Sequence, residues 1–195
     1  MVDLNRLQPL IVPAAYVQLN GWDLPHSPLP NLAFVVTWVE FEEGLTYLTR
    51  EEFEELEATA PGWPQRALDN VRQTQWFHRQ HKHGQAGELD WIAFLNDDDT
   101  SSSSKVLLQW ELSRIFPEGY LVGIPDRACA LVVSAHCTGD ALTQVRELMA
   151  QMYATATTPM SHELYPSSDF QVSDAWAAPI ADDPTPGAIL ALFEK

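Results

Sequence analysis

Three histidines lie close together in the sequence Phe-His-Arg-Gln-His-Lys-His, at positions His78, His81 and His83. Neutral imidazole is a good ligand for zinc or copper, so the cluster is a candidate metal site of a metal-assisted hydrolase. If a helix from about Pro64 to His78 continues through it, His78 and His81 share a face and His83 turns away. The alternative is a helix end, where part-charged histidines meet the negative end of the helix dipole.

A second cluster of candidate ligands consists of Asp97, Asp98 and Asp99, followed by Thr100 and four serines. Oxygen-rich loops bind hard cations, and the same carboxylates are candidates for contacts with a basic partner. However, three consecutive aspartates cannot all face one ion, and the spacing does not fit an EF-hand loop. We therefore expect a solvated turn between a strand and a helix, with several candidate helix caps.

Other catalytic motifs are missing from the sequence. It contains no G-x-S-x-G or S-x-x-K nucleophile motif and no glycine-rich phosphate loop, so we expect no bound cofactor. Cys137 follows His136, but neighbouring residues on a strand point to opposite faces, which is a poor arrangement for a Cys/His pair.

The chain is strongly acidic, with 27 Asp and Glu against 11 Lys and Arg and a formal charge of −16. Such a charge repels phosphate backbones and anionic lipids, so we expect neither a nucleic-acid nor a membrane partner. The sequence also lacks an apolar run of the roughly 20 residues that span a bilayer, and a signal peptide. We expect a cytoplasmic protein whose charge serves either solubility or a basic partner.

The acidic residues are densest between positions 40 and 57, where Arg50 is the only basic residue. The region is either a solvated helix face or a docking surface for a basic protein, with Glu51, Glu54 and Glu55 as candidate contact residues. Trp22, in a proline-rich loop at 21–31, is a further candidate, because tryptophan is enriched at binding hot spots. Trp22 could equally fill the bottom of the core.

Hydrophobic patterning predicts strands at 10–19, 32–41, 45–48, 89–95, 120–124, 128–135 and 170–172. Helices are expected at 49–60, 64–78, 102–115 and 138–157. Thr49 and Glu52 predict a capping box. The order ββ-β-αα-β-α-ββ-α favours an α+β fold, with four main helices on a mostly antiparallel sheet. We expect residues 1–175 to form one domain, and 176–195 a proline- and aspartate-rich linker with an apolar tail.

Residues 44 to 172 resemble the YtpQ-like family of uncharacterised bacterial proteins. The resemblance rests on Gly-Leu-Thr-Tyr-Leu-Thr at 44–49 before an acidic helix, on Phe-Leu-Asn at 94–96 before an Asp-rich loop, and on Leu-Val-Gly-Ile-Pro at 121–125. Ser-Lys-Val-Leu at 104–107 and Thr-Pro-Met-Ser at 158–161 add to it. The family implies a fold but no activity.

These observations lead to a first hypothesis of a non-catalytic binding protein, an inhibitor or immunity-type partner of a basic protein. The alternative hypothesis is a metal-assisted hydrolase that uses the histidine cluster or the Asp97–Asp99 loop. A third is a structural subunit that forms homo-oligomers through an apolar sheet face.

Overall fold

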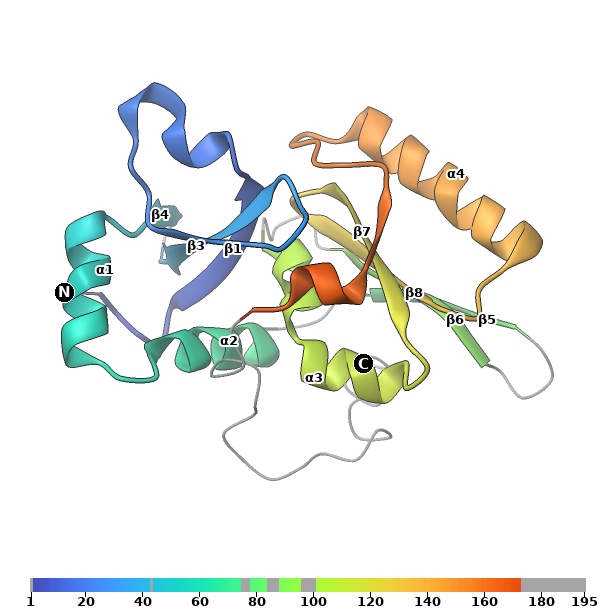
Figure 1. Ribbon diagram of the computed structural model, residues 1–195, viewed down its shortest axis with the longest axis horizontal. Helices are drawn as coiled ribbons and strands as arrows, with labels where there is room; N and C mark the ends of the chain where they lie inside the picture. Colours follow the sequence, from blue (N-terminus) through green and yellow to red (C-terminus); the bar gives the residue numbers. More distant parts are fainter. Residues whose placement is uncertain (1, 43, 75–77, 84–87, 96–100, 173–195) are drawn as a thin grey trace.

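Two antiparallel sheets and the helices around them form the molecule, which confirms the α+β class (Figure 1). The computed structural model describes residues 2–42, 44–74, 78–83, 88–95 and 101–172. The expected single sheet is thus two sheets. Residues 176–195, expected as a linker and tail, lie outside the described part.

The first sheet is centred on β3 (Phe34–Phe41), which lies within the strand predicted at 32–41. β1 (Leu7–Pro13) pairs with one side of β3, and β2 (His26–Pro28) and β4 (Leu45–Tyr47) pair with the other. β3 and β4 correspond to the strands predicted at 32–41 and 45–48. Alternate residues point to opposite faces, so Val36 and Trp38 enter one hydrophobic cluster while Val35 and Val39 enter another.

The second sheet has the strand order β5-β6-β8-β7-β9, so β5 and β9 are its terminal strands. The strands are β5 (His78–His83), β6 (Glu88–Leu95), β7 (Tyr120–Asp126), β8 (Cys129–Ser134) and β9 (Leu164–Pro166). One face packs against α4 (Gly139–Thr155) through residues such as Val133 and Met149. The other face joins the core shared with the first sheet, through residues such as Phe94 and Val132.

Three shorter α-helices complete the structure: α1 (Arg50–Thr59), α2 (Trp63–Gln73) and α3 (Gln109–Ile115). There are also 3₁₀ helices η1 (Tyr16–Gly21), η2 (Ser102–Leu107) and η3 (Ser167–Phe170). The predicted capping box starts α1: the Thr49 hydroxyl accepts a hydrogen bond from the Glu52 amide at 3.2 Å, and the Glu52 carboxylate accepts one from the Thr49 amide at 2.9 Å. Among the described residues, no helix is both long and apolar enough to cross a bilayer.

The segment from Ser101 to Lys105 corrects one expectation, because it is buried instead of solvated. η2 contacts β1 of the first sheet as well as β6, β7 and β8 of the second, so this polar segment lies between the sheets. Small hydroxyl side chains fit there: the Ser101 hydroxyl donates a hydrogen bond to the Gln8 side chain at 3.2 Å. The expected helix 102–115 is consequently split into η2 and α3 around Leu108, whose ψ of 57° is not helical.

Two further expectations are wrong. The helix expected to reach His78 ends as α2 at Gln73, because Thr74 adopts an extended ψ of 142°, and His78–His83 is a strand. The late strand expected at 170–172 is not formed: β9 lies before it, and Phe170 ends η3 as a fully buried core residue.

Candidate functional site

Helix α1 is held against the core by aromatic residues on its inner side. Trp63, at the start of α2, packs edge-on against Trp38 of β3 with ring centroids 4.5 Å apart, and against Phe53 of α1 at 5.5 Å. Leu56 is buried beside them. This packing leaves the opposite side of α1, which carries the glutamates, facing solvent.

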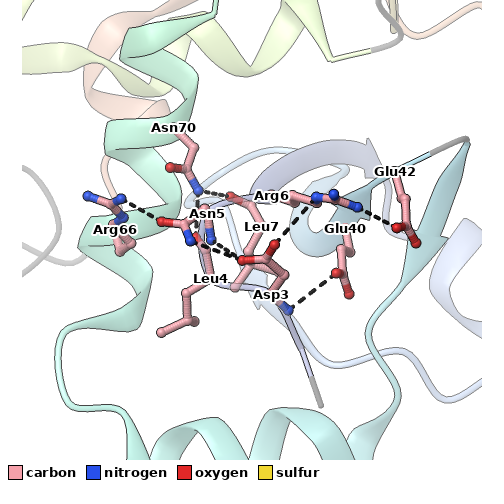
Figure 2. Close-up of polar contacts among 9 residues, drawn as sticks. All are labelled: Asp3, Leu4, Asn5, Arg6, Leu7, Glu40, Glu42, Arg66 and Asn70. Atoms are coloured by element: carbon pink, nitrogen blue, oxygen red, sulfur yellow. Dashed lines mark hydrogen bonds and ion pairs between the residues drawn. The ribbon is translucent and has the colours of Figure 1, made fainter.

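Four of the acidic residues between positions 40 and 57 have structural partners. Figure 2 shows Arg6 between Asp3 and Glu42, with its guanidinium 2.5 Å from the Glu42 carboxylate, and Glu40 accepting a hydrogen bond from the Asp3 amide at 3.2 Å. Glu52 belongs to the capping box, and Glu57 accepts a hydrogen bond from the Trp63 indole at 2.8 Å. These carboxylates form contacts within the protein that stabilise its fold.

The N-terminal segment, residues 3–7, is hydrogen-bonded to α2 (Figure 2). The buried Asn70 side chain donates hydrogen bonds to the Leu4 carbonyl at 2.7 Å and the Leu7 carbonyl at 2.8 Å. Arg66 donates one to the Asn5 side chain at 2.7 Å. A buried carbonyl or amide group without a hydrogen-bond partner costs free energy. This network therefore fixes the start of β1 relative to α2.

Glu51, Glu54 and Glu55 remain exposed, and none forms a hydrogen bond or ion pair with a described residue. Side chains three and four positions apart on a helix are neighbours, so the three carboxylates share one face of α1. Like charges at this spacing weaken a helix slightly. The three predicted contact residues therefore share one exposed face of α1.

Trp22 is exposed, with 45% of its surface accessible, so it does not fill the core. Its indole packs against Tyr16 and Tyr47, with ring centroids 5.8 Å and 6.0 Å away, and these two rings are 5.9 Å from each other. Tyr16 and Tyr47 also pack against the hydrophobic cluster of the first sheet that contains Val17 and Val39. Burial, and then the neighbouring Tyr16, raises the pKa of the Tyr47 hydroxyl.

An ion pair joins Trp22's segment to the start of α1. The Arg50 guanidinium donates two hydrogen bonds to the Asp23 carboxylate, at 2.7 Å and 2.8 Å. Arg50 lowers the pKa of Asp23, and Asp23 in turn raises the pKa of Arg50, with Glu54 adding to the effect. We call the set Trp22, Asp23, Glu51, Glu54 and Glu55 the acidic aromatic surface.

This surface has the chemistry to hold a cationic side chain. A guanidinium stacks on the face of an exposed tryptophan and binds carboxylates with two parallel hydrogen bonds. Asp23 already makes that bidentate contact with Arg50. Glu51, Glu54 and Glu55 offer the same acceptors to a partner.

The histidine cluster takes a different form from the expected one. β5 is a strand, and only the side chain of His81 is described. Its Nδ1 lies 2.9 Å from the Oδ2 atom of Asp90, a carboxylate that is only 2% exposed, and its ring stacks on Trp91 at 5.8 Å. The β5–β6 register shifts between His81, which is opposite Trp91, and Lys82, which is opposite Leu89, so Asp90 lies at a β-bulge. The bulge accounts for His81 reaching both Asp90 and Trp91.

A His–Asp pair can orient an imidazole for catalysis, but a nucleophile is needed. Cys137 is buried, and burial, with a further contribution from Asp90, raises the pKa of its thiol, which keeps it protonated and unreactive. His136 instead lies 2.7 Å from the exposed Glu118. The described residues contain no group of three His, Cys, Asp or Glu placed to hold a metal.

The described part of the molecule has pockets away from His81. One of about 420 Å³ is lined by residues including Asp126, Arg127 and Thr158, and one of about 450 Å³ by residues including Glu118 and His136. His81 lines neither pocket. Asp97, Asp98 and Asp99 lie outside the described residues, so they remain sequence-based candidates.

Sequence reasoning missed two features of these sites. The first is the packing of Tyr16 and Tyr47 against Trp22, because these tyrosines lie in separate segments that share no sequence pattern. Asp90 did carry a signal, because a single carboxylate inside the apolar strand Leu-Asp-Trp-Ile needs a partner when it is buried. Comparison of the chain with protein-family models, with curated proteins and with solved structures finds no match.

Proposed function

We propose that the protein is a non-catalytic binding protein that docks a basic protein segment on the acidic aromatic surface, as an inhibitor or immunity-type partner would. The observation that carries this proposal is the exposed Trp22, whose neighbour Asp23 pairs with Arg50 at the start of the helix that carries the exposed Glu51, Glu54 and Glu55. Hot spots combine a large aromatic anchor with charges that select the partner.

The preferred ligand side chain is arginine. Its planar guanidinium can stack on Trp22 and form two parallel hydrogen bonds with a carboxylate, whereas a lysine ammonium binds as a point charge. We place the protein in the cytoplasm as part of the proposal, since Cys129 and Cys137 are both free thiols, as is usual in reducing compartments. The likeness to the YtpQ-like family is kept as a proposal about ancestry.

A titration with an Arg–Gly repeat peptide, followed by amide and indole chemical shifts, tests the proposal. We expect saturable binding with shifts at the Trp22 indole and at residues 50–55. Trp22→Ala should weaken binding about tenfold, and a Lys–Gly peptide should bind less tightly than the Arg–Gly peptide.

The decisive variant is Glu51→Gln/Glu54→Gln/Glu55→Gln. Its matched control, Glu118→Gln/Glu147→Gln/Glu163→Gln, changes the net charge equally at exposed glutamates elsewhere. We expect about tenfold weaker binding for the first variant and little change for the second. Equal losses would show that only the overall charge of −16 attracts the peptide, and the proposed surface would then be wrong.

A further inference from the structure

β5 is a terminal strand with one free side. It pairs with β6 from His78↔Phe94 to His83↔Glu88, and no described strand pairs with its other side. A terminal strand presents unpaired backbone N–H and C=O groups, to which a further strand can add. β1, the outer strand of the first sheet, differs, because η2 and α2 contact it.

Both faces of β5 are open as well. Arg79, Gln80, His81 and Lys82 are all exposed. Consecutive strand residues point to opposite faces, so exposure of four in a row means that no described element covers either face of β5. A peptide that pairs with the backbone of β5 can therefore also contact side chains above and below the sheet.

The charge of β5 is opposite to that of the whole chain. Its six residues include Arg79, Lys82 and three of the six histidines, within a chain of net charge −16. Neither Arg79 nor Lys82 makes an ion pair with a described carboxylate. Two copies of β5 would bring like charges together, which disfavours pairing of a second copy. A segment with carboxylates on alternate residues complements the strand.

The middle of β5 is already ordered. His81 is held by the 2.9 Å contact with the buried Asp90 and by stacking on Trp91 with an interplanar angle of 10°. Ordering a strand on binding costs conformational entropy, and a strand fixed in advance avoids part of that cost. Charges more than about 8 Å from β5 are largely screened at physiological salt, and the nearby Asp90 carboxylate is buried against His81.

We infer that β5 is a docking edge for an extended acidic peptide segment, which adds to the second sheet as a strand beyond β5. The carboxylates of the segment contact Arg79 and Lys82, and its backbone pairs with the free side of β5. This surface is separate from the acidic aromatic surface and takes a ligand of opposite charge, so either proposal can fail without the other.

The probe for the test is a fluorescent peptide of alternating Glu and Val at physiological ionic strength. We expect saturable binding that weakens about tenfold in Arg79→Glu/Lys82→Glu, since each reversal replaces an attraction with a repulsion. The control Arg66→Glu/Arg146→Glu makes the same charge change at exposed sites elsewhere and should bind within about twofold of the unchanged protein. Circular dichroism checks that each variant is folded.

A second peptide tests the backbone pairing. Methylation of alternate amides removes the donors on one edge of the peptide and should abolish binding when that edge faces β5. The inference is overturned if Arg79→Glu/Lys82→Glu binds the Glu–Val peptide as tightly as the unchanged protein, if the methylated peptides bind equally well, or if a Lys–Val peptide binds more tightly.

Discussion

The acidic face of α1 and the basic strand β5 lie at opposite ends of the molecule (Figure 1). α1 packs on the core through Phe53 and Leu56, next to Trp63 of α2, and the side chains of Glu51, Glu54 and Glu55 are exposed. Among the described strands, β5 pairs with β6 alone, and the contact between His81 and Asp90 holds its centre. A net charge of −16 therefore conceals two local surfaces of opposite sign. Local packing, more than total charge, indicates which charges are available to a partner.

The largest expected effect on the free energy of unfolding comes from replacing the tryptophans that pack near α1 and β5, Trp38 and Trp91. Trp38→Ala should lower the free energy of unfolding by about 3–5 kcal/mol, because Trp38 is 1% exposed and packs against Trp63. Trp91→Ala should cost less, since Trp91 is only partly buried next to β5. Urea denaturation measures both variants. An equal cost would mean that the two regions are equally well anchored.

A smaller effect is expected from the two aspartate pairs. Asp90→Ala should destabilise the β5 end by about 1–3 kcal/mol, because it removes the buried partner of His81. Asp23→Ala breaks an exposed pair with Arg50, in which the Asp23 side chain is 74% exposed, and should destabilise the protein less than Asp90→Ala does.

Native-state hydrogen exchange locates these losses. Asp90→Ala should speed exchange of the β5 and β6 amides and leave those of α1 unchanged. Faster exchange in α1, or a greater loss of stability in Asp23→Ala, would contradict the comparison between the two ends.

The smallest expected effect is a pH dependence at the acidic aromatic end. The pKa of Tyr47 is raised in the folded protein, by burial first and by Tyr16 second, so the folded state holds this proton more tightly than the unfolded state. The resulting stability is complete below the unfolded pKa of about 10 and is lost as the pH rises through the folded pKa.

As the pH rises above about 10, the free energy of unfolding should therefore fall less steeply in the Tyr47→Phe variant than in the unchanged protein. Tyr120, whose pKa burial also raises, is present in both proteins and contributes equally to the two curves. Urea denaturation at a series of alkaline pH values gives the two slopes. Parallel curves would exclude a contribution from Tyr47.

The sequence was most informative where one residue pattern has one physical solution. The capping box at Thr49 and Glu52 and the apolar strands 32–41 and 128–135 are present close to where they were predicted. It was least informative for β5, because a strand exposed on both faces has no apolar alternation to recognise. The buried run Ser101–Lys105 shows the converse, since its polar composition does not reveal that two sheets enclose it.

The candidate site was predicted in part for the same reasons. Trp22, Glu51, Glu54 and Glu55 were distinguished by residue type, and the structure brings their segments together through the Asp23–Arg50 pair. That pair joins residues 27 positions apart, and no local pattern predicts such a contact. Asp90 and His81 likewise meet only because of a bulge in the strand pairing.

One measurement tests the central claim most directly: amide chemical shifts of one isotopically labelled sample, titrated separately with the Arg–Gly peptide and the Glu–Val peptide. We expect two separate sets of perturbed residues, the Trp22 indole with residues 50–55 for the basic peptide and residues 78–83 with their β6 neighbours for the acidic one. Overlapping sets, or shifts spread over the whole surface for both peptides, would contradict two docking surfaces of opposite charge.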